Sequence, residues 1–316
     1  MSESNARVAV LGEALIDRFP NADVIGGAPF NVARNLALLG AAPLMITRIG
    51  RDALGATIVA DFQRFGMDPR GLQHDAARAT GTVTVHMQGK SHRFEIGADS
   101  AWDHLDAAAA VQAIAASAPA VVYFGTLAQR SEVSRRAIHA ALGASNALPF
   151  LDLNLRDGPD NRALAEDSLQ RAAMVKVNDE ELDQLIAWFA PPATPARRWG
   201  EAGQRTAVEA LVARFELQRL TITRGAAGWA CFDARGAGWL EGTAPTVTVR
   251  DTVGAGDAFA SVLLLGELRG WPLRLTLQRA GEFASAVCGI AGAVDPASPI
   301  YAAASAAWTS VAHDAA

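Results

Sequence analysis

The pattern of apolar and polar residues predicts helices that alternate with strands buried on both faces. Continuous apolar runs predict strands at residues 7–11, 44–49, 120–124, 149–153, 174–177 and 219–223. Apolar residues at helical spacing predict helices at residues 29–39, 53–65, 107–116, 132–142, 167–172, 180–189, 207–215, 258–269 and 273–290. This alternation is typical of an α/β fold, in which helices cover the faces of a mainly parallel sheet.

A second pattern, with a period of two, marks residues 81–96. Apolar and polar residues alternate on either side of residues 88–91, which predicts a hairpin with one polar face. We expect this hairpin to be an antiparallel insertion that covers one end of the sheet as a lid. Residues 21–27 are rich in turn formers, and residues 191–204 have the composition of an exposed loop. Short antiparallel strands are predicted at residues 229–232, 238–240 and 246–249.

The composition is that of a globular protein with a large core, since 50% of the 316 residues are hydrophobic and 19% are charged. The net charge is -5 and lysine occurs only at positions 90 and 176, so neither nucleic acid nor an anionic membrane is expected as a partner. No apolar stretch reaches the length of about 18 residues that a membrane-spanning helix needs. The first apolar run is too short for a signal peptide, which predicts a cytoplasmic protein. Cys231 and Cys288 lie in apolar contexts and are expected to be buried free thiols.

Polar residues and glycines follow most of the predicted strands. Because parallel strands end at one edge of their sheet, where ligands bind, these residues are expected to lie near one another. They are Asp17, Gly26, Gly27, Asp52, Gly125, residues 154–156, residues 178–181, residues 223–225 and residues 251–257. Their clustering predicts a binding site at this edge.

The sequence DTVGAGDAFA at residues 251–260 leads into an apolar helical pattern. The small residues Gly254, Ala255 and Gly256 let backbone N–H groups approach an anion, and a helix start adds the positive end of its dipole. Asp257 beside such a site would repel phosphate, but it could accept the proton of a hydroxyl that attacks phosphorus. The alternative is a glycine-rich turn in which Asp257 caps the helix.

The turn GGAPFN at residues 26–31 precedes a predicted helix. Gly27 allows a ligand to approach closely, and the Asn31 amide offers both a donor and an acceptor. Together with Asp17, whose carboxylate can accept from two vicinal hydroxyls, Asn31 could form a sugar clamp. The alternative is a β-turn that places Asn31 in the first turn of the helix.

Two further motifs have both a functional and a structural interpretation. Asn178 and Glu181 lie three residues apart at a helix start, where they could hold hydrated Mg²⁺ or form a capping box. The stretch TRGAAG at residues 223–228 follows a strand. There the Thr223 hydroxyl and nearby N–H groups could meet a nucleotide phosphate, or the stretch could be a hairpin turn.

Taken together, these motifs resemble those of the ribokinase-like (PfkB) family of carbohydrate kinases. One signature is GGAPFNVA at residues 26–33, followed by Gly40 and Gly50 at the family's spacing, and the other is DTVGAGD at residues 251–257. GRDALG at residues 50–55 and NDEE at residues 178–181 look like the family's GxDxxG and NxxE. The resemblance covers nearly the whole chain. It implies a single three-layer α/β/α domain at residues 1–312, a β-strand lid formed by about residues 18–27 and 81–98, and a tail at residues 313–316.

The resemblance also implies a role for each candidate residue. Asp257 would be the base that deprotonates a sugar hydroxyl, and Gly254, Ala255 and Gly256 would form the anion hole for the phosphoryl group. The sugar would be held by Asp17, Gly27 and Asn31. Asn178 and Glu181 would organise Mg²⁺ and the phosphates of ATP, while the nucleotide site would be lined by Thr223, Gly225 and Gly228. Many relatives bind a monovalent cation such as K⁺ beside the anion hole, and Asp251 and the Val253 carbonyl match part of that site.

Within the family, residues 12–17 (GEALID) and 152–156 (DLNLR) look most like bacterial fructokinases and 2-keto-3-deoxygluconate kinases, although Leu153 replaces a proline that is frequent there. A ketohexose is therefore the first candidate substrate. The alternatives are 2-keto-3-deoxygluconate, ribose or a nucleoside, and a catalytically silent sugar-binding regulator. An acid sugar needs a cation, for which Arg93 or Arg156 could serve, and a nucleoside needs a stacking surface such as Phe94 or Trp102. The exposed face of the hairpin could also form a homodimer.

Overall fold

The computed structural model describes residues 7–88, 91–156, 158, 161–191 and 202–310. Within these residues, nine strands form one sheet in the order β13-β12-β11-β10-β9-β8-β1-β4-β5. They are β1 (Val8–Leu11), β4 (Leu44–Gly50), β5 (Leu72–Asp75), β8 (Val121–Gly125), β9 (Leu148–Asp152), β10 (Met174–Asn178), β11 (Arg219–Thr223), β12 (Trp229–Asp233) and β13 (Gly238–Gly242). The strands from β11 to β5 pair in parallel, and β12 and β13 extend the sheet antiparallel. The predicted mainly parallel sheet is confirmed.

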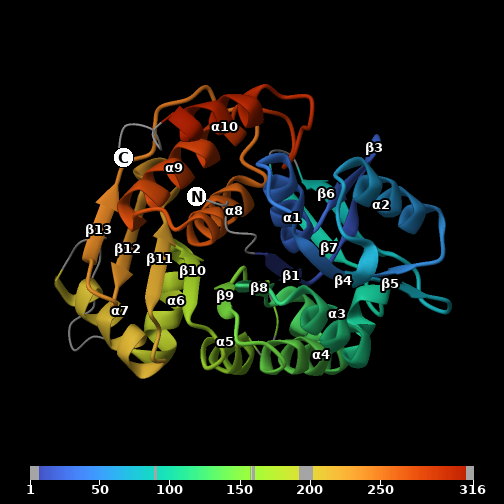
Figure 1. Cartoon of the computed structure of the whole chain (residues 1–316), viewed down its shortest axis with the longest axis horizontal. Coiled ribbons are helices and arrows are strands. Elements are labelled where there is room, and N and C mark those ends of the chain that lie inside the picture. Colours follow the sequence, from blue (N-terminus) through green and yellow to red (C-terminus); the bar gives the residue numbers. More distant parts are fainter. Residues whose placement is uncertain (1–6, 89–90, 157, 159–160, 192–201, 311–316) are drawn as a thin grey trace.

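Helices cover both faces of this sheet (Figure 1). Successive residues of a strand point to opposite faces, so each buried strand contributes to both helical layers. In β1, Val8 and Val10 belong to one hydrophobic cluster, and Ala9 and Leu11 belong to the other. The first cluster includes residues of α1 (Ala28–Leu38), α2 (Ala53–Arg64), α8 (Ala255–Arg269), α9 (Leu273–Val287) and α10 (Ile300–Ser310). The second includes residues of α3 (Ala107–Ser117), α4 (Glu132–Gly143), α5 (Asn161–Leu169), α6 (Asp179–Phe189) and α7 (Ala202–Arg214). The molecule therefore has the expected three layers.

A second, smaller sheet has the strand order β3-β2-β6-β7. It contains β2 (Leu15–Phe19), β3 (Ala22–Gly26), β6 (Gly81–Gln88) and β7 (Ser91–Ile96), and in Figure 1 it lies at the end of the molecule that carries α2. The predicted hairpin is confirmed as β6 and β7, which pair antiparallel. The expectation of a turn at residues 21–27 was wrong, because most of them form β3. Residues 22–24 of this edge strand are exposed, so it lacks the apolar pattern that marks a buried strand.

The GRDALG motif at residues 50–55 holds the start of β6 against the large sheet. The Asp52 carboxylate caps α2 by accepting from the Gly55 N–H at 2.8 Å, and it also accepts from the N–H and the hydroxyl of Thr80 at 2.8 and 2.7 Å. A Cβ at Gly55 would lie 2.2 Å from the Gly50 carbonyl oxygen, so a side chain cannot fit there. The motif thus has a structural function.

Several elements differ from the sequence-based expectation. Residues 246–249 form no strand, and Val247 and Val249 are 37% and 59% exposed. Helix α5 begins at Asn161 instead of residue 167, since its buried residues are Ala165, Ser168 and Leu169, and the first two are small and show little apolar contrast. Strand β5 was missed because of its four residues only Asp75 is buried.

Helix α10 was also missed. Its alanine-rich sequence has few large apolar anchors, of which Tyr301 and Trp308 pack edge-on against Phe283 of α9. Short 3-10 helices occur at Pro69–Gly71, Ala101–His104, Leu127–Arg130 and Gly225–Ala227. The expected tail at residues 313–316 and most of the loop expected at 191–204 lie outside the described residues. None of the helices in the described ranges is both long and apolar enough to cross a membrane.

Candidate active site

The first turn of α8 has the geometry of an anion site. Gly254 is the N-cap residue with φ +79°, and a Cβ there would lie 2.4 Å from the Cβ of Ala293. Only glycine combines this left-handed backbone with such a close neighbour. Because the first N–H groups of a helix have no partner within it, those of Gly256 and Asp257 are free of helical hydrogen bonds and mark a place where an anion is stabilised.

Asp257 lies in this first turn and contacts the motif at residues 26–31. Its Oδ2 accepts a hydrogen bond from Nδ2 of Asn31 at 2.8 Å. Burial raises the pKa of Asp257 to about 6, whereas the bond from Asn31 and the charges of Lys176 and Arg156 lower it. The carboxylate is therefore mostly ionised at neutral pH and can accept a proton.

The other two predicted sugar-binding residues are found near the same place. Gly27 is the N-cap of α1 with φ +101°, and a Cβ there would lie 2.5 Å from the carbonyl oxygen of Glu13. Asp17 extends from β2 over Gly26, since a Cβ at Gly26 would lie 2.1 Å from Oδ2 of Asp17. Burial raises the pKa of Asp17 to about 6, and the charges of Arg156 and Arg34 lower it.

Arg156 is an exposed residue of the loop after β9. Its charge lowers the pKa of Glu13, Asp17 and Asp257, so it lies within electrostatic reach of all three. Within the described part of the chain, its guanidinium forms no ion pair. Arg93 pairs with His86 in the ladder between β6 and β7, but its side chain and that of Phe94 lie outside the described residues.

Asn178 and Glu181 form the capping box at the start of α6. Asn178 Oδ1 accepts from the Glu181 N–H at 2.7 Å, and Glu181 Oε2 accepts from the Asn178 N–H at 2.9 Å. Glu181 Oε1 accepts in addition from the N–H of Leu155, so both of its oxygens already have partners. No group of three His, Cys, Asp or Glu residues in the described ranges could hold a metal ion. Mg²⁺ near Glu181 would thus take most of its ligands from phosphate and water, as this ion commonly does.

Thr223, Gly225 and Gly228 form the turn between β11 and β12, and the same residues line a pocket. Residues 223–228 thus form the predicted hairpin turn and also line a pocket, so the two interpretations of this stretch are compatible. The other pocket residues come from the region around β12 and from α8 and α9: Trp229, Ala244, Ala255, Gly256, Phe259, Gly281, Ala284, Ser285 and Cys288. Because Ala255 and Gly256 belong to the anion site, the pocket is continuous with it.

The Asp251 side chain connects two loops. Its Oδ1 accepts from the Val253 N–H and its Oδ2 from the Gly292 N–H, both at 3.0 Å. Val253 is half exposed. The Asp251 carboxylate, which was predicted to form part of a monovalent cation site, thus also fixes the backbone that leads into Gly254.

Sequence reasoning missed four charged residues of this region. Glu13 follows β1, is only 2% exposed, and has a pKa raised by burial to about 7. Lys176 and Asp152 form a buried pair, and Arg34 contacts Asn31. Charged residues inside otherwise apolar strands, or directly after one, were the signal that could have identified Glu13, Asp152 and Lys176.

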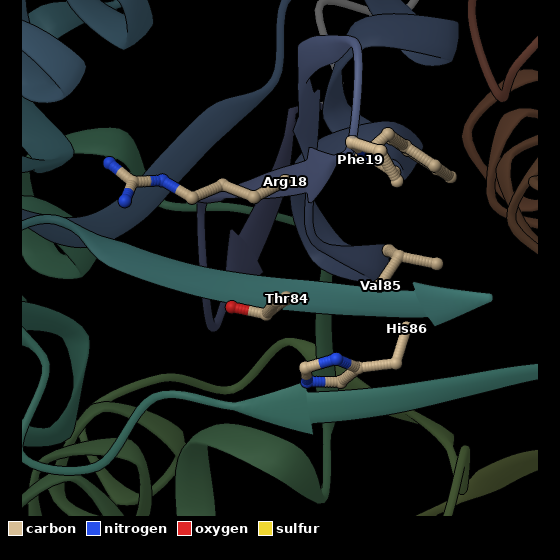
Figure 2. Close-up of a pocket in the computed structure, with 6 residues that line it drawn as sticks. Arg18, Phe19, Thr84, Val85 and His86 are labelled. Atoms are coloured by element: carbon tan, nitrogen blue, oxygen red, sulfur yellow. The ribbon is translucent and has the colours of Figure 1, made fainter.

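Two other expectations need correction. Trp102 was a candidate stacking surface for a nucleoside, but it is fully buried, and the guanidinium of Arg130 lies 4.1 Å from its ring centroid. Cys231 is buried as expected, whereas Cys288 is partly exposed in the pocket beside α9. A separate surface pocket on the small sheet, shown in Figure 2, contains no predicted site residue; its lining residues are Arg18, Phe19, Pro20, Thr84, Val85 and His86.

The sequence is similar to those of known proteins. The sequence model of the pfkB family carbohydrate kinases matches residues 6–300. A fructokinase of Klebsiella pneumoniae is 30% identical over 276 residues, which cover 83% of this chain and 84% of the relative. A 2-dehydro-3-deoxygluconokinase of Thermoproteus tenax is 27% identical over 277 residues, or 85% of this chain and 80% of the relative.

The fold is likewise similar to solved structures. A fructokinase from Vibrio cholerae, crystallised with fructose, ADP and calcium ion, superposes with a TM-score of 0.75 at 23% identity, covering 95% of this chain and 99% of the other. A fructokinase from Xylella fastidiosa with bound ATP gives a TM-score of 0.72 at 24% identity, covering 92% and 94%. The chain therefore belongs to the pfkB family of carbohydrate kinases and is an ATP-dependent sugar kinase.

Proposed function

We propose that this kinase phosphorylates a hydroxyl of a ketohexose and that Asp257 is its general base. The observation that carries the proposal is the position of Asp257, which lies in the first turn of α8 beside Gly254 and is hydrogen-bonded to Asn31. The Asp257 carboxylate takes the proton of the sugar hydroxyl while its oxygen bonds to the γ-phosphorus and the bond to ADP breaks. In the turn formed by Gly254, Ala255 and Gly256, the Ala255 N–H donates to the Thr252 carbonyl oxygen at 3.3 Å, so the N–H groups of Gly256 and Asp257 stabilise the charge on the phosphoryl oxygens.

Asp17, Gly27 and Asn31 hold the sugar in this proposal. Asp17 presents a partly buried carboxylate that can accept from two neighbouring hydroxyls. Gly27 lets the sugar approach the start of α1. Fructokinases are among the relatives, so a ketohexose is the first candidate substrate in this proposal.

The nucleotide occupies the pocket between the turn at Thr223, Gly225 and Gly228 and helices α8 and α9. Mg²⁺, bound with ATP, supplies charge neutralisation at the phosphates. Asn178 and Glu181, at the start of α6, are the residues that would contact the water bound to this ion. A K⁺ ion beside the anion hole would be held by Asp251 and the Val253 carbonyl. The small sheet, with residues 18–27 and 81–98, acts as the lid that excludes water.

A second candidate substrate is 2-keto-3-deoxygluconate. Arg156 favours it, because its positive charge acts on both Asp17 and Asp257 and its guanidinium forms no ion pair in the described residues. A carboxylate on the sugar would satisfy this cation. A nucleoside is less well supported since Trp102 is buried.

The test is a coupled ADP-release assay with the full chain on ketohexoses, aldohexoses, pentoses, 2-keto-3-deoxygluconate and nucleosides, each with and without K⁺. A ketohexose should give the highest kcat/KM, and the Asp257→Asn variant should lose about 10²–10⁴-fold in kcat. Asp106→Asn is the matched control, because Asp106 caps α3 and asparagine caps equally well. Higher kcat/KM on the acid sugar would replace the ketohexose. Sugar binding without phosphoryl transfer to any acceptor would instead indicate a sugar-binding regulator.

A further inference from the structure

Arg34 lies one turn after Asn31 on α1 and is only 5% exposed. Its Nη2 donates to Oδ1 of Asn31 and to the carbonyl oxygen of Ile25 in β3, the latter at 3.0 Å. Its Nη1 donates to Asp61 of α2 at 3.3 Å. The guanidinium also lies 5.1 Å from the ring centroid of Phe30. These contacts from three elements hold the guanidinium in one place.

The chemistry at both ends of the Asn31 side chain determines how its amide is turned. Arginine carries only donors, so the amide oxygen must face Arg34. An ionised carboxylate carries only acceptors, so the amide nitrogen must face Asp257, as observed at 2.8 Å. A flipped amide would place N–H against guanidinium and oxygen against carboxylate, and both contacts would be repulsive.

We propose that Arg34 is a positioning residue that holds the Asn31 amide with its N–H group toward Asp257 and thereby keeps the catalytic carboxylate ionised. The inference rests on the proposed function, in which Asp257 is the base. Among the described residues, the hydrogen-bond partners of the Arg34 guanidinium are Asn31, Ile25 and Asp61, so Arg34 acts on Asp257 through Asn31.

The electrostatic surroundings of Asp257 make this bond important. Burial and the negative charge of Asp152 favour the protonated form, and the hydrogen bond from Asn31 is the largest influence that opposes them. Asp257 interacts electrostatically with charged or titratable groups from several elements. They are Glu13 after β1, Arg34 on α1, Tyr123 on β8, Asp152 on β9, Arg156 in the following loop and Lys176 on β10. Without Arg34, the amide is free to turn and one positive charge is lost. Both changes raise the pKa of Asp257.

The proposal can be tested by direct titration of Asp257 in protein labelled with ¹³C at aspartate carboxyl groups, using Asp257→Asn to assign the signal. In Arg34→Met the pKa of Asp257 should rise by about one unit, and the acid limb of kcat/KM should move by the same amount. Asn31→Leu should produce a similar shift, and the double variant should show little more than either single one. Arg34→Lys, which restores a donor, should recover part of the shift.

Arg219→Met is the matched control. Arg219 is also a buried arginine, and it pairs with Asp233 and with Glu267 near the far end of α8. It should cost stability without moving the titration of Asp257. If Arg34→Met and Arg34→Lys lower kcat equally at every pH and leave the titration unchanged, Arg34 is only structural and the proposal is overturned. If no sugar is phosphorylated, the proposed function fails, whereas the titration still decides the role of Arg34.

Discussion

The ammonium group of Lys176 lies 2.9 Å from Oδ1 of Asp152, and both side chains are buried under the start of α8. A Cβ at Gly256 would lie 3.4 Å from Nζ of Lys176, so this ion pair directly adjoins the anion site. The two charges act in opposite directions on Asp257, since Asp152 raises its pKa and Lys176 lowers it. The pair therefore supports the backbone of the site and balances its charge.

Breaking this pair from one side should be costly. We expect Lys176→Met to destabilise the fold by about 3–5 kcal/mol, because it leaves the buried Asp152 carboxylate without a counter-charge. The double variant Asp152→Leu with Lys176→Met should regain most of that loss. Urea unfolding measures both. Arg136→Met, which breaks the exposed pair with Glu132, is the control and should change stability by less than about 1 kcal/mol. A double variant no more stable than Lys176→Met would contradict the prediction.

The anion site should not tolerate a side chain at Gly254. In Gly254→Ala the added Cβ meets Ala293 at 2.4 Å in a left-handed backbone, so the turn must move away from the phosphoryl group. We expect a loss of about 10²–10³-fold in kcat with a much smaller change in sugar KM. Gly270→Ala is the control, because Gly270 is also left-handed at the other end of α8 but has open space around its Cβ position. Equal losses of kcat in the two variants would show that backbone strain, and not the site, is responsible.

The buried Glu13 should make stability depend on pH. Its folded-state pKa of about 7 lies above the ordinary value of 4.5, so between these values the folded protein holds a proton that the unfolded chain has lost. Stability should therefore fall as pH rises from about 4.5 to 7, by up to roughly 3 kcal/mol from this group. Glu13→Gln removes this dependence.

Urea unfolding of the Glu13→Gln variant at pH 5 and pH 8 measures the effect. Relative to the wild type, the variant should gain about 2–3 kcal/mol between the two pH values. Glu132→Gln, a change at a side chain that is 70% exposed, should leave the dependence of the wild type intact. If the wild type and Glu13→Gln respond to pH in parallel, Glu13 is not held protonated by burial.

The lid, formed by about residues 18–27 and 81–98, remains the predicted dimer surface. Phe19 and Val24 are 37% and 41% exposed, and the strand register places Val24 opposite Asp17. Figure 2 shows Phe19 and Arg18 pointing to opposite sides of β2. Sedimentation of the wild type should give a dimer, and Phe19→Ser with Val24→Ser should give a monomer. Val133→Ser, an equally exposed apolar residue of α4, is the control and should leave the dimer intact. A monomeric wild type would refute this surface.

Some features of the fold and the candidate site could be predicted from the sequence. Parallel strands buried on both faces need continuous apolar runs, and β1 and β8 show this. The glycines Gly27 and Gly254 indicated the two turns of the candidate site. In the structure each adopts a positive φ, and a side chain there would collide with a neighbouring residue. The helix predicted from residue 258, which begins at Ala255 in the structure, and the capping box of Asn178 and Glu181 depend mainly on neighbours in sequence, which is why local patterns indicated them.

The sequence by itself thus determined the α/β layers and the segments that form the candidate site, and the tertiary structure decided how those segments meet. The exposed edge strand β3 and the alanine-rich α10 have too little apolar contrast to be recognised, and their partners alone define them. The bond between Asn31 and Asp257 joins residues that are 226 positions apart, and the pair of Lys176 and Asp152 joins neighbouring strands. Hydrogen bonds and ion pairs act over a few ångströms, so their partners are determined by the packing of the whole sheet and its helices, which a linear pattern does not contain.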